Sequence, residues 1–277
     1  MPGDRVEQHY ARSGLISTIR DRLRAAGKNL DHLTTADLAA IDEFHIRGRQ
    51  ATEELAARLR PTAAGRVLDL GSGLGGPSRH LAATYGCHVV GIDLTETYCA
   101  VATELAAWTG LSDLVEYRQA DALDLPFPDA SFDIAWTQHV AMNIADKPRL
   151  YGEMHRVLRP GGMLAIYDVV QGPGGEPSFP VPWASHAGLS HLVTPEELRR
   201  LLKAAGLVIE SWHDTSEAGR RSIEAQDRRL RASEAPPLVL SILFGAEAPT
   251  VSRNLHGNLL EGRVGLLEVT ARADGQR

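Results

Sequence analysis

Cysteine is scarce in this chain. Cys87 and Cys99 are its two cysteines in 277 residues, which is too few for a disulfide framework. The Cys-x-x-Cys and His-Glu-x-x-His spacings of common zinc sites are missing as well. We therefore expect two reduced, buried thiols and no metal site.

An excess of positive charge is also missing. The chain has 29 Lys and Arg against 35 Asp and Glu, a formal net charge of -6. Because such a surface does not attract a polyanion, we expect no nucleic-acid partner.

Long apolar runs are absent too. No uninterrupted apolar stretch is long enough to cross a bilayer, and the first residues, MPGDRVEQHYARSG, lack the apolar segment of a signal peptide. The sequence therefore predicts a cytoplasmic protein with no membrane partner. Hydrophobic residues nevertheless make up 43% of the chain, enough for a full globular core.

What the sequence does contain is an alternation of short apolar runs with helical patterns. The runs predict strands at Val67–Leu70, His88–Ile92, Val115–Arg118, Phe132–Trp136, Met163–Tyr167 and Val208–Trp212. Helices are predicted between them at Ser78–Tyr85, Glu96–Trp108, Arg149–Leu158 and Glu196–Ala205. Strand, helix and strand repeated in this way predict right-handed crossovers and an α/β fold with a parallel sheet covered on both faces.

The two ends of the chain have other patterns. Ile16, Ile19 and Leu23 recur at helical spacing and predict an amphipathic helix over Val6–Ala26. We expect residues 1–60 to form a helical cover and residues 61–277 the main domain. Near the C-terminus, the patterns predict helical stretches and a last strand at Glu217–Glu234, Pro237–Leu260 and Val264–Ala273.

The stretch VLDLGSGLGG, residues 67–76, predicts a ligand site. Its Gly71-x-Gly73-x-x-Gly76 spacing lets a ligand approach the backbone after the first strand. Asp69 lies just before these glycines and would repel the pyrophosphate of a nicotinamide dinucleotide. It would stabilise the ammonium and sulfonium of S-adenosylmethionine. Asp69 therefore favours that cofactor, with a simple turn cap as the alternative.

Two further acids follow the next strands. Asp93 ends the second predicted strand about twenty residues after the glycines, where a carboxylate accepts both ribose hydroxyls. Asp121 follows the third strand, where its side chain meets the adenine amino group. Together with Asp69 they predict a nucleoside-bearing, cationic ligand.

These residues resemble the class I S-adenosylmethionine-dependent methyltransferases of the small-molecule type, which include ubiquinone/menaquinone, sarcosine–dimethylglycine and sugar O-methyltransferases. The resemblance is carried by VLDLGSGLGG, GIDLT, ADALDLPFPDASFD and EMHRVLRPGGMLAIYDVV. It covers about Arg66 to Trp212. It implies a Rossmann-like sheet of seven strands, mostly parallel, in which the last strand, Val264–Ala273, inserts antiparallel beside Val208–Trp212.

The resemblance also implies a set of cofactor-binding residues. Asp69 and the glycines at 71, 73 and 75 would hold the methionyl part, Asp93 the ribose, and Asp121 and Ala122 the adenine. Arg49, in the stretch EFHIRGRQAT, would reach the cofactor carboxylate, unless it is merely solvated or salt-bridged. The full expected set is Arg49, Asp69, Gly71, Ser72, Gly73, Gly75, Asp93, Leu94, Asp121, Ala122 and Gln138.

The acceptor side is predicted from the loop WTQHVAMNIADKP. Where relatives that methylate hydroxyls often carry histidines, this chain has Met142 and Asn143. His139 and Asp168 are candidate bases or substrate hooks, and Asn143 joins them as a catalytic candidate. A His that satisfies backbone groups and an Asp that caps a turn are the alternatives. With no obvious strong base, the loop favours an amine acceptor over a hydroxyl. The alternative is an O-methyltransferase of a natural product or sugar, with His139 as base.

Residues Gln171–His191, within an insertion at 171–193, are longer than an ordinary connection. We expect this segment to be a lid in which Phe179, Trp183 and His186, with Met142 nearby, face the acceptor. A packed Ω-loop is the alternative.

Three other function classes are weighed against this one. A methyltransferase acting on nucleic-acid amines would carry a [DNS]PP[YFW] motif where this chain has WTQH. A nicotinamide oxidoreductase is disfavoured by Asp69, and a non-methylating user of S-adenosylmethionine stays open. The sequence therefore predicts a methyltransferase with a small-molecule acceptor, and a homodimer is one expected state.

Overall fold

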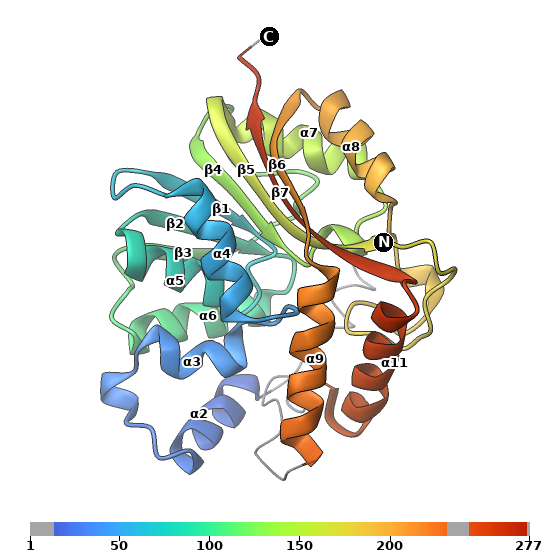
Figure 1. Cartoon of the computed structure of the whole chain (residues 1–277). Coiled ribbons are helices and arrows are strands. Elements are labelled where there is room, and N and C mark those ends of the chain that lie inside the picture. The colour runs from blue at the N-terminus through green and yellow to red at the C-terminus, as the bar shows by residue number, and fades with distance from the viewer. Residues whose placement is uncertain (1–13, 232–243, 276–277) are drawn as a thin grey trace.

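A computed structural model describes residues 14–231 and 244–275 (Figure 1). Its centre is a seven-stranded sheet in the order β3-β2-β1-β4-β5-β7-β6. The strands are β1 (Arg66–Leu70), β2 (His88–Asp93), β3 (Val115–Gln119), β4 (Phe132–Gln138), β5 (Leu158–Gln171), β6 (Leu207–Asp214) and β7 (Val264–Ala273). β7 is antiparallel to both of its neighbours, β5 and β6. The predicted Rossmann-like sheet with an antiparallel last strand is confirmed.

The helices flank this sheet or extend from its edge. They are α2 (Leu15–Ala25), α3 (Thr35–Asp42), α4 (Arg49–Leu59), α5 (Gly76–Tyr85), α6 (Glu96–Trp108), α7 (Lys147–Val157), α8 (Pro195–Ala204), α9 (Ser216–Arg231) and α11 (Ala248–Leu260). Short 3-10 turns are η1 (Leu30–His32), η2 (Ala141–Asn143), η3 (Ala187–Leu189) and η4 (Gly245–Glu247). In Figure 1, α4 and α5 lie on one side of the sheet and α7 and α8 on the other.

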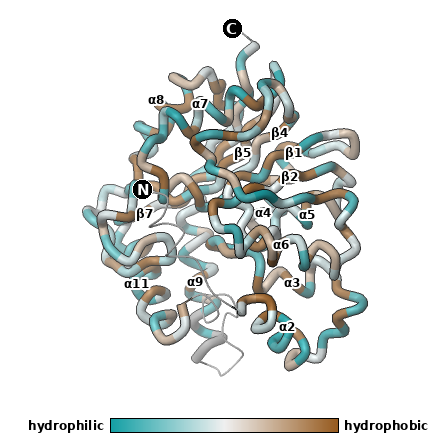
Figure 2. The backbone as a smooth tube through the Cα atoms, turned by 180° about the vertical axis from the view of Figure 1, so that it is seen from behind, coloured by the Kyte–Doolittle hydropathy of each residue, from teal (hydrophilic) through white to brown (hydrophobic). Residues whose placement is uncertain are grey.

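Alternation along the strands explains the two covered faces. Val67 packs in the core shared with α4 and α5, whereas its neighbour Leu68 packs in the core shared with α7 and α8. Successive side chains of a strand point to opposite faces, so a sheet buried on both sides needs apolar residues at every position. Figure 2 shows hydrophobic residues along the central strands accordingly.

Some boundaries differ from the prediction. β5 reaches Gln171 and so continues four residues past the predicted end at Tyr167. α7 begins at Lys147, because Asp146 accepts a hydrogen bond from the Arg149 backbone N–H and a proline occupies the first turn. These local caps move the helix start ahead of the apolar pattern.

The cover and the C-terminal helices meet at one end of the sheet. Leu15, Ile19 and Leu23 of α2 are buried with Leu38 of α3 and Val251 of α11. The predicted Val6–Ala26 helix is therefore present as α2, and its residues 6–13 lie outside the described ones. The same holds for residues 232–243 of the predicted C-terminal stretches. A division at residue 60 stays a prediction.

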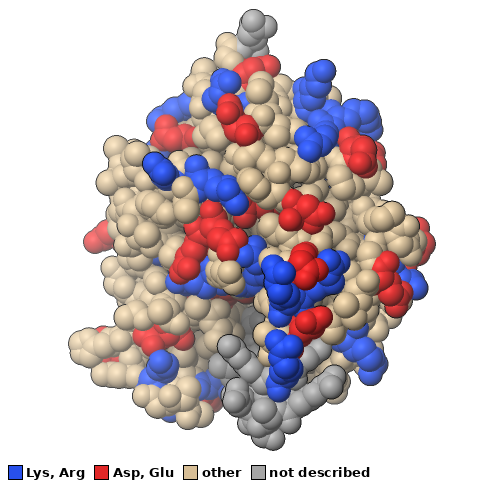
Figure 3. All heavy atoms as spheres, in the orientation of Figure 1, with Lys and Arg blue, Asp and Glu red and all other residues tan. Residues whose placement is uncertain are grey.

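The surface carries both signs of charge. Figure 3 shows Lys and Arg intermixed with Asp and Glu over α4 and α9. In α9, Arg220 and Arg221 both pair with Glu217. Within the described ranges, no helix is long and apolar enough to span a membrane.

Candidate functional site

A cavity of about 1410 Å³ lies at the carboxyl ends of the central strands. The turn after β1, the end of β2 and the loops after β3 and β4 form one end of it. The cover segment 39–50, the predicted lid, α9 and Leu255 of α11 form the remainder. In α/β sheets this edge is where ligands bind.

Gly71 and Gly73, in the turn after β1, are glycine for two different reasons. Gly71 and Gly73 both have positive φ, 69° and 53°, a conformation that favours glycine. A Cβ on Gly71 would lie 2.3 Å from a methyl of Val140, whereas one on Gly73 would meet nothing within 4 Å. Gly71 thus allows close packing of the loop after β4, and Gly73 presents open backbone to the cavity.

Asp69 lines this cavity and is 2% exposed. Ser78 Oγ donates a hydrogen bond to its Oδ2 at 2.5 Å. Burial raises the pKa of the Asp69 carboxyl to about 7. A buried carboxyl with one donor is stabilised as an anion by a cationic ligand. Its described partner is Ser78 and not the turn backbone, so the arrangement differs from a simple turn cap.

Asp93 lies beside the same turn. Its two carboxyl oxygens accept backbone N–H groups from Gly73 and Thr95, each at 2.9 Å. Burial raises the pKa of the Asp93 carboxyl. Leu94 also lines the cavity. The carboxylate retains further lone pairs for ribose hydroxyls.

Asp121 and Ala122 form the outer wall of this end. Asp121 is exposed and accepts the Leu123 backbone N–H at 2.9 Å. One of its oxygens therefore caps a turn, and the adenine contact stays a prediction.

The donor set fits the expected cofactor. Ser72 Oγ lines the cavity, is buried, and has no hydrogen-bond partner within residues 14–231 and 244–275. A buried polar atom without a partner is costly, so a ligand that supplies one is favoured. Asp69, Asp93 and Ser72 thus offer polar partners to an ammonium and a ribose at one end of the cavity.

Two predicted cofactor residues do not line the cavity. Arg49 forms an ion pair with Glu43 at 2.5 Å and donates to the Thr35 carbonyl at 3.1 Å. This is the salt-bridged alternative, because the side chain ties α4 to α3. Gly75 is required by packing, since a Cβ there would lie 2.3 Å from the Tyr117 hydroxyl.

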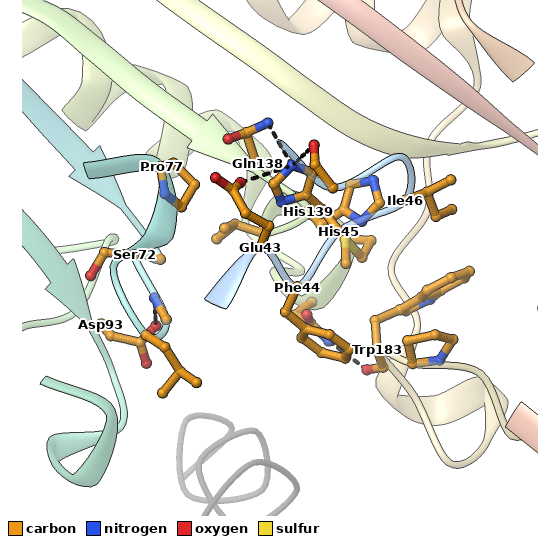
Figure 4. A pocket seen from close by; sticks show the side chains of 18 of the residues that line it. Glu43, Phe44, His45, Ile46, Ser72, Pro77, Asp93, Gln138, His139 and Trp183 are labelled. Atoms are coloured by element: carbon orange, nitrogen blue, oxygen red, sulfur yellow. Dashed lines mark hydrogen bonds and ion pairs between the residues drawn. The ribbon is translucent and has the colours of Figure 1, made fainter. Parts of the chain in front are cut away.

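His139 lies where β4 ends and has a positive φ of 54°. Its ring stacks on Tyr167 with centroids 5.0 Å apart. It also meets His45 edge-on, with centroids 5.9 Å apart, and both histidines are labelled in Figure 4. Burial, and then the charge His45 would carry, hold the His139 pKa well below 6.5. Its Nε2 is buried without a partner among the described residues. A strained backbone and an open nitrogen are features of functional sites.

His45 is a site residue that the sequence analysis did not identify. Its Nε2 lies 3.2 Å from Gln138 Nε2 and 3.0 Å from the Gly48 carbonyl oxygen. Gln138 is itself oriented by the Trp136 indole N–H, which donates to its Oε1 at 3.0 Å. Burial lowers the pKa of His45 to about 4. His45 belongs to the stretch EFHIRGRQAT, which could have identified it. The sequence analysis used that stretch only to predict a cofactor contact for Arg49.

Asp168 is not where the sequence analysis expected it. It is 3% exposed and does not line the cavity. Its carboxylate accepts the backbone N–H groups of Ala141 and Val169, both at 2.8 Å. β5 continues past Asp168, so the side chain faces the underside of the loop after β4 and fixes that loop instead of facing an acceptor.

Lys147 is a second residue that the sequence analysis missed. Its Nζ donates to the carbonyls of Ala141 at 2.7 Å and His191 at 2.6 Å, and also to that of Ile144. Burial lowers the pKa of Lys147 to about 8, against the attraction of Asp168. Lys147 therefore fastens the loop after β4 to the end of the predicted lid.

Lys147→Met is expected to lower the free energy of unfolding by about 1–3 kcal/mol, because buried carbonyls lose their donor. Hydrogen exchange should speed up at residues 141–146 and 189–193. Urea denaturation and exchange measured by mass spectrometry test this, with exposed Lys203→Met as the matched control. Equal behaviour of the two variants would contradict the assignment.

The remaining acceptor residues divide into two groups. Met142, Asn143 and Trp183 line the cavity, and Asn143 Nδ2 donates to the Trp183 carbonyl at 2.6 Å. Phe179 packs against the core and His186 is exposed and caps η3. Neither of these two lines the cavity, so the expectation that they face the acceptor is wrong.

The segment 171–193 is anchored to α11. Asn258 accepts the Ser178 N–H at 2.7 Å and donates to its carbonyl at 2.9 Å, and Asn254 donates to the Pro180 carbonyl at 3.0 Å. Trp183 is 2% exposed, and its indole N–H donates to Ser190 Oγ at 3.0 Å. The segment is thus packed in the manner of an Ω-loop, and opening as a lid stays a prediction.

In the part of the chain that the structure describes, no group of three His, Cys, Asp or Glu side chains is placed to hold a metal ion.

Comparisons with known proteins agree with this geometry. Residues 68–166 match the family model described as a methyltransferase domain. The 27-O-demethylrifamycin SV methyltransferase of Amycolatopsis mediterranei is 34% identical over 200 residues, which cover 71% of this chain and 72% of that protein. Methyltransferase GfsG of Streptomyces halstedii is 40% identical over 134 residues, 48% of each protein.

A third relative is the glycine/sarcosine/dimethylglycine N-methyltransferase of Actinopolyspora halophila. It is 32% identical over 176 residues, 64% of this chain and 31% of that protein. The matches thus span about half of GfsG and a third of this enzyme. Among solved structures, the [4+2]-cyclase SpnF superimposes with a TM-score of 0.66 at 27% identity, covering 81% of each chain.

Proposed function

Because the chain belongs to the class I S-adenosylmethionine-dependent methyltransferases, we propose that it methylates an amine nitrogen of a small molecule. S-adenosylmethionine supplies a methyl group that its sulfonium already activates, so the protein mainly holds and orients the acceptor. In this proposal Asp69 holds the cationic methionyl part, Asp93 the ribose, and Asp121 the adenine side. The part of the cavity around His45 and His139 is called the transfer end. The observation that supports an amine acceptor is the weak basicity of these two side chains.

Neither base proposed from the sequence, Asp168 or His139, is a strong proton acceptor at the transfer end. The Glu43 carboxylate beside His45 is held by Arg49. Asp168 lies outside the cavity, and burial depresses the pKa of both His139 and His45. An amine that enters a buried site loses its proton more readily, because burial disfavours the cation. The proton passes to bulk water as the amine enters, and the lone pair is then free without an enzyme base. The imidazole of His139 remains neutral and accepts a hydrogen bond that orients the nitrogen.

A hydroxyl acceptor is the second candidate. The Nε2 of His139, which has no hydrogen-bond partner among the described residues, favours it, and the rifamycin relative is named for a 27-O-demethyl substrate. In this case His139 would take the hydroxyl proton. The depressed pKa of His139 makes it a poor base for that step, which places the hydroxyl second.

His139→Gln is expected to lower the rate of an amine methylation by no more than about tenfold, because only orientation is lost. The rate should rise with pH up to the pKa of the bound amine and then level, in the variant as in the wild type. Methyl-labelled cofactor, with product masses and fragmentation, locates the methyl group. Exposed His186→Gln is the control.

A base role for His139 would give a different result. The variant would then lose about 10²–10⁴-fold in rate, and the rising limb would lie below pH 6.5, where the His139 pKa is held. Label on oxygen together with that profile would make the hydroxyl candidate correct. Label in no product from any acceptor would point to a non-methylating role.

A further inference from the structure

The cavity is larger than its cofactor end requires. Small-molecule pockets are usually about 300–1,000 Å³, whereas this cavity measures about 1410 Å³. Ser72 and Asp93 lie at one end and Ile46 and Trp183 at the other (Figure 4). We call the part of this cavity at the Ile46 and Trp183 end the acceptor chamber (Figure 4).

The walls of the acceptor chamber are mainly apolar. They come from four separate parts of the chain, the cover, the segment 171–193, α9 and α11. The apolar side chains are Phe44, Ile46, Trp183, Leu189, Ile223 and Leu255. Ile46, Trp183, Ile223 and Leu255 are each at most 9% exposed. Such walls favour a ligand with a large apolar surface.

Most charged side chains around this chamber are already in ion pairs with other residues of the chain. Each charged side chain below lines the cavity and has an ion-pair partner within the described chain: Asp42 with Arg79, Glu43 with Arg49, Arg47 with Glu54, and Arg221 with Glu217. Asp146 receives the backbone N–H of Arg149. A carboxylate or phosphate on the acceptor would lose its hydration without gaining an unpaired cation from these side chains, and the carboxylate that could meet an ammonium, Asp146, is exposed at the rim and not among the apolar walls.

We propose that the acceptor is a bulky, mainly apolar, ring-bearing molecule that presents one uncharged nitrogen toward His139. The inference rests on the proposed methyl transfer and narrows its substrate class. Phe44 and Trp183 supply ring surfaces for the body of the acceptor. Hydrophilic amines of amino-acid size leave these walls uncovered and are poor acceptors.

The test uses N-phenyl-1-naphthylamine, an uncharged, fluorescent aromatic amine, with the full chain and saturating S-adenosylhomocysteine. We expect one saturable site with micromolar affinity. Ala225→Trp fills the chamber from α9, where Ala225 lines the cavity, and should weaken probe binding at least tenfold. Its affinity for S-adenosylhomocysteine should stay within about twofold of wild type.

Arg228→Trp is the matched control, because Arg228 is exposed on the same helix and does not line the cavity. It should bind the probe as the wild type does. Ala218→Leu, also on the α9 wall, gives a second variant with a smaller added side chain should Ala225→Trp not fold. Unchanged probe affinity in folded chamber variants would overturn the proposal.

A second measurement separates this inference from the proposed function. Glycine and ethanolamine at millimolar concentration should neither displace the probe nor accept labelled methyl as well as bulky aromatic amines do. Efficient methylation of glycine would support the proposed amine methylation but contradict the inference of a bulky, apolar acceptor. If the chamber variants weaken probe binding as expected but no amine accepts labelled methyl, the apolar chamber is supported and the proposed amine methylation is contradicted.

Discussion

Replacing Arg79 with methionine is expected to lower the free energy of unfolding by about 3–5 kcal/mol. Arg79 is 0% exposed on α5 and pairs with Asp42, the last residue of α3, at 2.6 Å. It also donates to the Leu74 carbonyl at 2.6 Å. Removing one partner of a buried pair leaves the other charge uncompensated, which is among the most destabilising single changes. Because Leu74 and Asp42 line the cavity, cofactor affinity should fall as well.

The double variant Arg79→Met/Asp42→Leu provides the control. It removes both charges and should recover most of the lost stability, because a buried pair replaced by apolar side chains is often neutral. Urea denaturation at pH 7 measures both. Burial already raises the pKa of Asp42, so the single variant should lose less stability at pH 5, where that carboxyl protonates more readily. Equal losses in the single and double variants would refute the buried-charge explanation.

The second large effect is expected for Asp69→Asn at pH 8. Affinity for S-adenosylhomocysteine should fall by about 2–3 kcal/mol, or roughly 30- to 150-fold, because the ligand ammonium loses a charged acceptor. The Asp69 pKa of about 7 also sets a pH dependence. Below pH 7 the free carboxyl is protonated and must release that proton to bind the cation. Wild-type affinity should therefore fall as the pH drops from 8 to 6, whereas that of the variant should change little.

Isothermal titration at pH 6, 7 and 8, in buffers of different ionisation enthalpy, measures both the affinity and the proton release. Exposed Asp113→Asn is the control and should behave as the wild type does. The same pKa has a consequence for the unliganded fold. Between pH 4 and 7 the native state binds more protons at Asp69 than the unfolded state, so its contribution to stability falls as pH rises. An Asp69→Asn variant with wild-type affinity at pH 8 would remove this carboxylate from the cofactor site.

The sheet and the cofactor end followed from local patterns. Apolar runs alternating with helical patterns predicted strands at the positions of β1 to β6, and β7 was predicted from its own alternation. Asp69, Gly73 and Asp93 meet because parallel strands present their carboxyl ends at one edge. Each of these residues lies close to the end of a strand, so their spacing in the sequence is enough to predict that they meet.

The acceptor side depended on contacts that no local pattern records. Lys147 reaches His191, and His45 reaches Gln138, across long stretches of chain. From their positions along the chain, Arg49 was predicted to bind the cofactor and Asp168 to act as a base. In the structure Arg49 pairs with Glu43, and Asp168 accepts the backbone N–H of Ala141, so both side chains have structural roles. Phe179 and His186 were placed with Trp183, although only Trp183 reaches the cavity.

By itself, then, the sequence determined the class of fold, the family and the cofactor, because strand periodicity and a glycine turn with flanking acids act over a few residues. The tertiary structure decided which of the candidate bases line the cavity and how large that cavity is. Burial is the physical reason. Burial lowers the pKa of His139, and the Glu43–Arg49 ion pair occupies charges that the sequence alone leaves unassigned. Neither effect can be read from residues taken one stretch at a time.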